Sequence, residues 1–290
     1  MAPTRTFEAG EPVSAFALSP AGAELAAALK SGKIRVWSLS GKTLRSWPAG
    51  APAGSLFYAG EHRIVTVTGG SVAVFDAASG QELARWDAHE RPIESFASSG
   101  NVSVLATASD DGTVKLWKAD GSPLRTLRGG AGEMQGVAVA PAGDRVAAAG
   151  SDANVYVFDV RTGAVQHVLD LDMSCYPLEF SPDGRILAAG SVDGSVTLWN
   201  ADTGASMGVL GRYPVPVGAV RFSADGKRLT ATGLSMNPST AQTEATIWDL
   251  SSRKPATIPL GLSTWNAAAF SPAGPVVVAV HHRTISVWES

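Results

Sequence analysis

The side chains that most often carry acid–base, nucleophilic or metal chemistry are few and scattered in this sequence. They comprise a single cysteine, Cys175, and five histidines, His62, His89, His167, His281 and His282. Adjacent residues rarely bind one ion together, so we interpret His281-His282 as a polar turn, with a metal site as the alternative. Cys175 has no flanking base and lies in an apolar context, so we expect a buried small side chain rather than a nucleophile.

Motifs of cofactor-binding and hydrolytic enzymes are missing as well. The sequence contains neither a GxxxxGK[ST] phosphate loop nor a GxSxG nucleophile turn. Asp110, Asp111, Asp152 and Asp193 resemble a carboxylate cluster, but three of them recur at one place in an internal repeat, which favours a structural role. The sequence therefore predicts a protein that is not an enzyme, with no catalytic residue, no metal and no cofactor.

The elements that hold these side chains are copies of one repeated unit. A short alternating stretch that ends in an aromatic residue recurs seven times, with 38 to 49 residues between copies. The closing aromatics are Trp37, Phe75, Trp117, Phe158, Trp199, Trp248 and Trp288. Alternation of β-branched or aromatic residues with polar ones is typical of half-buried strands. A repeat of this length predicts a solenoid or a propeller.

Each repeat contains four strands, which we name a, b, c and d in chain order. Turn sequences such as SPDG (181–184) follow strand a, and sequences such as NADTG (200–204) follow strand c. The segment 23–30 is rich in alanine and leucine, but its place in the repeat predicts strand b and not a helix.

The two chain ends predict how the fold closes. The last repeat stops after its strand c, at Trp288, whereas residues 5–10 precede the first repeat and have the spacing of a strand d. We therefore expect residues 5–10 to complete the C-terminal blade, which closes a ring without a long exposed sheet edge. The predicted fold is all-β, a single seven-bladed β-propeller over residues 1–290 with four antiparallel strands in each blade.

The pattern resembles the WD-repeat β-propeller family over essentially the whole chain. In that family a histidine before strand a, a Ser or Thr in strand b, an aspartate in the b–c turn and the strand-c tryptophan form a hydrogen-bonded tetrad. The matching residues in the best repeat, 88–118, are His89, Ser109 (or Thr107), Asp111 and Trp117. The resemblance implies that these four residues are structural. The literal Trp-Asp pair occurs once, at Trp248-Asp249, and four repeats lack the turn aspartate.

Comparison of the repeats with one another predicts a binding surface. At the start of strand a, one column of residues is apolar in every repeat, which indicates packing between blades. The next column follows no rule of size or polarity, and we expect it to bind a partner through Ser14, Glu94, Gln135, Tyr176 and Asn266. In the WD-repeat family this column lies on the face made by the d–a and b–c loops, where partners are commonly held. The long b–c loop 234–244, with Met236 and Pro238, belongs to the same face.

Composition and charge suggest the kind of partner. The net charge is −3, so we expect neither a nucleic-acid partner nor a membrane. The d–a and b–c loops of the first five repeats carry more acidic than basic residues, which favours a basic protein or peptide. The single cysteine and the lack of an apolar signal segment lead us to expect a cytoplasmic protein, and we expect a monomer.

The sequence thus predicts a non-catalytic scaffold that binds protein or peptide partners on the d–a/b–c face. Two alternatives remain open at this point. One is a propeller enzyme or cofactor-binding propeller, and the other is the sensory or targeting domain of a larger protein.

Overall fold

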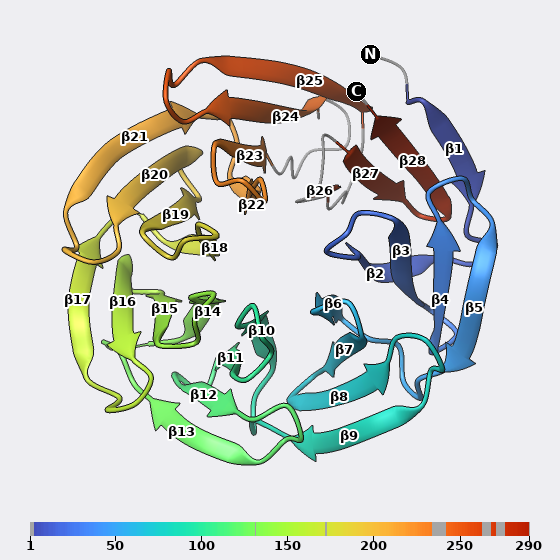
Figure 1. Cartoon of the computed structure of the whole chain (residues 1–290), viewed down its shortest axis with the longest axis horizontal. Coiled ribbons are helices and arrows are strands. Elements are labelled where there is room, and N and C mark those ends of the chain that lie inside the picture. Colours follow the sequence, from blue (N-terminus) through green and yellow to red (C-terminus); the bar gives the residue numbers. More distant parts are fainter. Residues whose placement is uncertain are drawn as a thin grey trace. The chain divides into compact units, whose positions relative to one another are not determined.

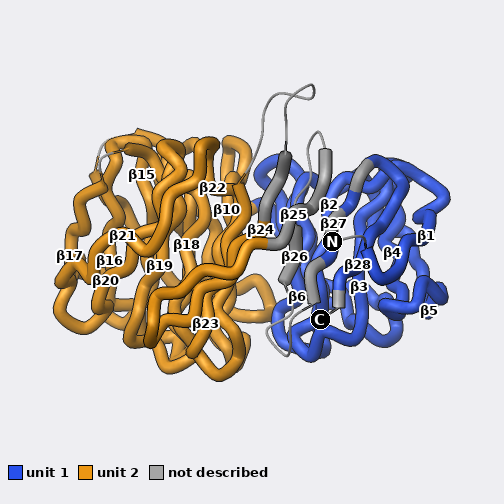
Figure 2. The backbone as a smooth tube through the Cα atoms, turned by 90° about the horizontal axis from the view of Figure 1, so that it is seen from above, with its two compact units in different colours: residues 1–87, 235–244, 258–290 blue, residues 88–234, 245–257 orange. Residues whose placement is uncertain are grey.

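The structure is a computed structural model that describes residues 3–130, 132–171, 173–233, 242–262, 268–270 and 276–289. All regular structure in these residues is β, and the strands form seven four-stranded antiparallel sheets (Figure 1). Two compact units comprise residues 1–87, 235–244 and 258–290 (unit 1) and residues 88–234 and 245–257 (unit 2; Figure 2). Within the described ranges, no helix is present that could cross a membrane.

Unit 1 contains three sheets. The first is β2 (Val13–Leu18), β3 (Glu24–Leu29), β4 (Lys33–Ser38) and β5 (Thr43–Pro48), and the second is β6 (Ser55–Ala59), β7 (Arg63–Thr68), β8 (Ser71–Asp76) and β9 (Glu82–Asp87). The third runs in the order β1 (Arg5–Glu8), β28 (Thr284–Glu289), β27 (Val276–His281) and β26 (Ala268–Phe270).

The third sheet joins the two ends of the chain. Arg5 lies opposite Val287 and Glu8 lies opposite Thr284, in antiparallel register. The Phe7 ring packs 6.2 Å from the Trp37 ring and lies against Gly41, where a Cβ atom would come within 2.9 Å of Phe7. The prediction that the N-terminal segment completes the C-terminal blade is therefore confirmed, with the strand at Arg5–Glu8.

Unit 2 holds most of four further sheets. Blade 3 is β10 (Ile93–Ser98), β11 (Leu105–Ser109), β12 (Val114–Trp117) and β13 (Pro123–Leu127), and blade 4 is β14 (Met134–Val139), β15 (Arg145–Gly150), β16 (Asn154–Asp159) and β17 (Val165–Asp170). Blade 5 is β18 (Cys175–Phe180), β19 (Ile186–Ser191), β20 (Ser195–Asn200) and β21 (Ser206–Arg212). Blade 6 is β22 (Val217–Phe222), β23 (Arg228–Gly233), β24 (Gln242–Asp249) and β25 (Pro255–Leu262).

The core of each unit lies between neighbouring sheets. The strand-c aromatics Trp37, Phe75 and Phe158 are almost fully buried, and each belongs to an apolar cluster that its own sheet shares with a neighbouring sheet. The Ala- and Leu-rich segment predicted as a strand is β3, in which Leu25 and Leu29 are completely buried. Packing between sheets thus overrides the helix propensity of alanine and leucine, because a strand buries both faces of this segment.

Candidate partner-binding site

Blade 3 contains a hydrogen-bonded network around a buried histidine. His89 Nδ1 lies 2.8 Å from Asp111 Oδ2, and His89 Nε2 lies 2.7 Å from Thr107 Oγ1. A carboxylate can only accept, so Nδ1 carries the proton and the neutral ring accepts at Nε2 from the Thr107 hydroxyl. Trp117 Nε1 in turn donates to Thr107 Oγ1 at 3.0 Å. The network connects the d–a segment, strand b, the b–c turn and strand c of one blade.

The strand-b member of this network is Thr107, the second of the two predicted candidates, and not Ser109. Ser109 Oγ donates to the Arg91 carbonyl at 3.3 Å and accepts from the Asp111 amide at 3.1 Å, so it shapes the turn. The sequence analysis also missed Thr113, whose hydroxyl donates to Asp111 Oδ1 at 2.5 Å. Both serine and threonine point to the same side of strand b, and only the register shows which one reaches the histidine.

Protonation in this network follows from burial and hydrogen bonds. Burial lowers the pKa of His89, which outweighs the stabilisation of its charged form by Asp111. Burial alone would raise the pKa of Asp111, but hydrogen bonds from Thr113 and His89 outweigh it and the pKa is lowered. A neutral imidazole beside an ionised carboxylate is therefore the resting state at neutral pH. Both ring nitrogens of His89 are thus engaged inside the blade.

Blade 6 achieves the same connection with a tyrosine. Tyr213 lies four residues before Val217, as His89 lies four residues before Ile93, and it is buried. Its hydroxyl donates to the Ala231 carbonyl at 2.7 Å and accepts from the Thr246 amide at 3.1 Å. The ring packs edge-on against Trp248, with centroids 6.1 Å apart. The longer side chain reaches the backbone of strands b and c, where Ala231 offers no hydroxyl.

Blade 4 has a third arrangement, in which Gly130 occupies the position that corresponds to His89. A Cβ atom at this glycine would lie 2.2 Å from the Tyr156 hydroxyl, so the tyrosine of strand c fills the space from the other side. Tyr156 donates to Asp152 Oδ2 at 2.5 Å, and this hydrogen bond raises the pKa of Tyr156. The turn aspartate is therefore bound in blade 4 without a histidine.

The predicted partner-binding column occupies a distinct backbone feature, a β-bulge in strand a. In five sheets the register with strand b shifts at this position, so that the column residue has no partner of its own in the ladder. The bulged residues are Ser14, Glu94, Gln135, Tyr176 and Gly218. A bulge re-aims a side chain and releases it from the alternation that fills the core. This explains why the column follows no rule of size or polarity.

Three of these bulged residues lie on neighbouring strands of unit 2, namely β10, β14 and β18. Tyr176 is 47% exposed, Glu94 is exposed, and Gln135 is partly buried. The Gln135 Oε1 atom is buried without a hydrogen-bond partner among the described residues. Gly136 permits the close approach of the strands, since a Cβ atom there would lie 2.3 Å from the Tyr176 carbonyl oxygen.

The other predicted site residues belong to unit 1 or lie outside the described residues. Ser14 is in unit 1, where its hydroxyl donates to the Ala28 carbonyl at 3.1 Å. Asn266, Met236 and Pro238 lie outside the described residues, as do most residues of the loop 234–244. Within the described part of unit 2, the structure places Glu94, Gln135 and Tyr176 on neighbouring strands.

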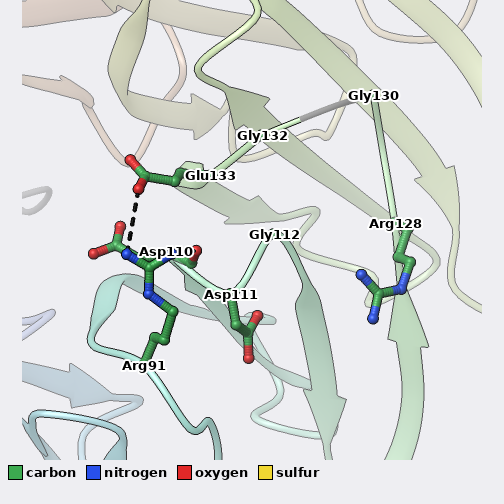
Figure 3. A pocket seen from close by; sticks show the side chains of 8 residues that line it. All are labelled: Arg91, Asp110, Asp111, Gly112, Arg128, Gly130, Gly132 and Glu133. Carbon is green, nitrogen blue, oxygen red and sulfur yellow. Dashed lines mark hydrogen bonds and ion pairs between the residues drawn. The ribbon is translucent and has the colours of Figure 1, made fainter.

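An open cavity of about 340 Å³ lies in unit 2 (Figure 3), and two of its lining residues, Asp110 and Glu133, are close enough for their charges to act on Glu94. Asp110 and Glu133 line one side of the cavity, and Arg91 extends between them. Arg91 donates to the Asp110 carbonyl at 2.8 Å and lies 3.6 Å from Glu133 Oε1. Burial and the charges of Asp110 and Glu133 raise the pKa of Glu94. Burial is the larger cause, and the two neighbouring carboxylates add repulsion to it.

Comparison with known proteins gives the family. The family described as "WD domain, G-beta repeat" (WD40) matches residues 1–38, 80–118, 121–159 and 163–200, which together make up just over half of the chain. The chain belongs to the WD40 repeat family. The matched segment 80–118 contains the network of blade 3, and the segment 121–159 contains the Tyr156–Asp152 pair of blade 4. WD40 repeats build β-propellers from four-stranded antiparallel blades and serve as scaffolds for protein interactions.

Curated relatives match the WD40 region over part of their length. The chain is 27% identical to Pre-mRNA-processing factor 19 homolog 2 of Arabidopsis thaliana over 221 residues, which is 72% of this chain and 40% of that protein. It is 27% identical to the guanine nucleotide-binding protein subunit beta of Oryza sativa subsp. japonica over 206 residues, 65% of this chain and 52% of that protein. WD repeat-containing protein VIP3 of Arabidopsis thaliana is 35% identical over 146 residues, 44% of each chain. The chain spans about half or less of the length of these relatives.

The remaining chemistry-bearing side chains of this WD40 chain have separate surroundings where the structure describes them. Cys175 is completely buried, and burial raises the pKa of its thiol. His167 Nε2 lies 3.1 Å from the Asp202 carbonyl, in a contact between blades 4 and 5. The side chain of His281 lies outside the described residues, and His282 is exposed in the β27–β28 turn. Among the described residues, no three His, Cys, Asp or Glu side chains gather as a metal site would require.

Proposed function

We propose that this WD40 protein is a non-catalytic scaffold that binds a protein or peptide at the d–a/b–c end of blades 3, 4 and 5. The observation that supports this proposal most strongly is the row of bulged residues Glu94, Gln135 and Tyr176. Each is held by a rigid sheet, is released from the ladder, and is either exposed or leaves a polar atom unpaired. A rigid frame with unused side chains binds a partner at little cost in conformational entropy.

Each of the three residues has a specific role in this proposal. Tyr176 offers a large surface with few rotatable bonds, which suits an anchoring contact. The Gln135 oxygen accepts a hydrogen bond from the partner after a side-chain rotation, because no described residue donates to it in the free protein. Glu94 lies near the carboxylates of Asp110 and Glu133, so its charge favours a basic partner and speeds its association.

We further propose that the seven sheets form one closed seven-bladed ring, a single domain over residues 1–290. Three features support closure: the pairing of β1 with β28, the four-stranded composition of every sheet, and the family membership. The proposal includes a cytoplasmic monomer with a protein or peptide partner, and it includes no nucleic-acid or membrane partner. The net charge of −3 agrees with the last point.

The test is affinity capture of partners from cells of the source organism, quantified by mass spectrometry for the wild type and for matched variants. Tyr176→Ala and Glu94→Gln alter the proposed site. Leu83→Ala removes a side chain that is 49% exposed on β9, and Glu61→Gln removes an exposed charge at the opposite end of a blade. Tyr176→Ala should weaken capture of the same partners by more than about fivefold, which corresponds to a contact of about 1 kcal/mol.

The control variants Leu83→Ala and Glu61→Gln should capture those partners as the wild type does. Equal capture by Tyr176→Ala, Glu94→Gln and the wild type would show that the partner binds elsewhere.

A further inference from the structure

The cavity lined by Asp110 and Glu133 has walls of opposite charge. Figure 3 shows Arg128 on the side opposite to Arg91, Asp110 and Glu133, with Asp111 and three glycines between them. The acidic wall comes from the b–c turn of blade 3 and the end of the d–a segment, and Arg128 comes from the start of the same d–a segment. The loop composition alone predicts a basic partner, whereas a cavity with walls of both charges suits a partner that carries both charges.

The acidic wall has an unbalanced negative charge. Asp110, Glu133 and the neighbouring Glu94 are three carboxylates, and Arg91 is the single cation that bridges two segments of this wall. Within the described part of the chain, no side-chain cation pairs with Asp110 or Glu94. A Lys or Arg side chain of a partner would therefore relieve repulsion at this wall.

Arg128, by contrast, has no anionic partner among the residues that the structure describes. Its side chain is exposed, and it makes no hydrogen bond or ion pair with any residue that the structure describes. Two turn carboxylates of blades 3 and 4 are already engaged: Asp111 binds His89 and Thr113, and Asp152 binds Tyr156 and Asn154. Arg128 therefore faces the cavity as a guanidinium with five donors and no acceptor of its own.

Three glycines keep the space between these walls free of side chains. Gly112, Gly130 and Gly132 all have positive φ angles, of 77°, 55° and 118°. A Cβ atom would lie 2.8 Å from the Gly132 carbonyl oxygen at Gly112, and 2.0 Å from Asp152 Oδ2 at Gly130. Larger residues are thus excluded at Gly112 and Gly130, and these positions add no side chain to the lining of the cavity.

We infer that this cavity selects a peptide segment that carries a Lys or Arg side chain close to an acidic side chain, and that Arg128 recognises the acidic one. The inference rests on the proposed function of the neighbouring bulged residues. A segment with basic residues alone would place its charge near the unpaired Arg128, and a segment with acidic residues alone would be repelled by Asp110, Glu133 and Glu94. Specificity arises from both the attraction and the repulsion.

The experiment is selection from a display library of short random peptides on the full chain, followed by sequencing of the selected pools. The wild type is compared with Arg128→Gln and with Arg161→Gln, a matched control that removes an exposed arginine at the opposite end of blade 4. The wild type and Arg161→Gln should enrich Lys or Arg together with Asp or Glu at a preferred spacing. Arg128→Gln should enrich Lys or Arg only.

Affinities of individual selected peptides complete the test. Arg128→Gln should weaken mixed-charge peptides by about two- to fivefold, the range of an exposed ion pair, and leave their Asp→Asn or Glu→Gln analogues unchanged or bound more tightly. Enrichment of basic residues without acidic ones on the wild type overturns the inference and leaves the proposed function standing. A selected pool that lacks basic residues, and that is the same on the wild type, Glu94→Gln and Tyr176→Ala, overturns both the inference and the proposed function. Equal acidic enrichment on the wild type and Arg128→Gln overturns the role of Arg128.

Discussion

Blades 3 and 6 fix the d–a segment to the other strands of the blade with different side chains. In blade 3 the d–a segment is fixed by His89, which connects Asp111 of the turn to Thr107 of strand b. In blade 6 Tyr213 occupies the same position in the repeat and bonds to the backbone of Ala231 and Thr246. In both blades the strand-c tryptophan packs beside the network, at Trp117 and Trp248.

The difference shows what these networks do. A catalytic constellation needs particular functional groups at a substrate, and a tyrosine bonded to two backbone groups could not replace a histidine–aspartate pair in such a role. A structural connection between strands needs only a buried group with satisfied hydrogen bonds. The exchange of histidine for tyrosine therefore supports a structural role for both. The bulged residues Glu94, Gln135 and Tyr176 have the opposite character, because each is exposed or has a polar atom without a described partner.

The largest effect is expected from Tyr213→Ala in blade 6. The change removes a buried ring that packs on Trp248 and leaves the Ala231 carbonyl and the Thr246 amide without their partner. The free energy of unfolding should fall by about 3–5 kcal/mol, as measured by chemical denaturation. Tyr213→Phe keeps the ring and should cost about 1–3 kcal/mol. A cost below about 1 kcal/mol for Tyr213→Ala would mean that blade 6 does not depend on this residue.

A smaller loss is expected from His89→Ala in blade 3, at about 1–3 kcal/mol, because Asp111 and Thr107 lose a shared partner. Thr107→Val and Ser109→Ala form a matched pair on β11. Thr107→Val should cost more than Ser109→Ala, since Thr107 bonds both His89 and Trp117. The reverse order in unfolding experiments would restore Ser109 to the network.

The smallest expected effect is a difference between blades 3 and 6 in how the free energy of unfolding depends on pH. Burial lowers the pKa of His89 below its unfolded value of about 6.5. Its contribution is therefore fully present above that pH and is lost as the pH falls through the folded pKa. Between about pH 7.5 and about pH 5, the wild type should lose more stability than His89→Asn, whereas Tyr213→Phe should follow the wild type. Parallel curves for all three proteins would show that His89 titrates alike in the folded and unfolded states.

The strands could be predicted well from the sequence because the same strand-c aromatics and turn residues recur in successive repeats. Seven strand-c aromatics and the turn sequences were enough to place β3 despite its helix propensity and to pair β1 with β28. Tyr213 could have been found by its spacing, four residues before Val217. The choice between Thr107 and Ser109 could not be made, because both lie on one side of a strand and register alone decides. The bulges and the unpaired Arg128 were also hidden, since they depend on hydrogen-bond registers and side-chain partners that only three-dimensional structure defines.

One pair of variants tests most directly whether stabilisation of the blade and binding of a partner depend on different residues at the d–a/b–c end. Affinity for a captured partner and the melting temperature are measured together for Tyr176→Ala and His89→Ala. Tyr176→Ala should weaken binding by more than about fivefold, the effect of losing a contact of about 1 kcal/mol, and leave the melting temperature unchanged. His89→Ala should lower the melting temperature and leave the affinity of the folded protein unchanged. A His89→Ala protein that melts normally but no longer binds, beside a Tyr176→Ala protein that binds normally, would contradict this assignment of roles.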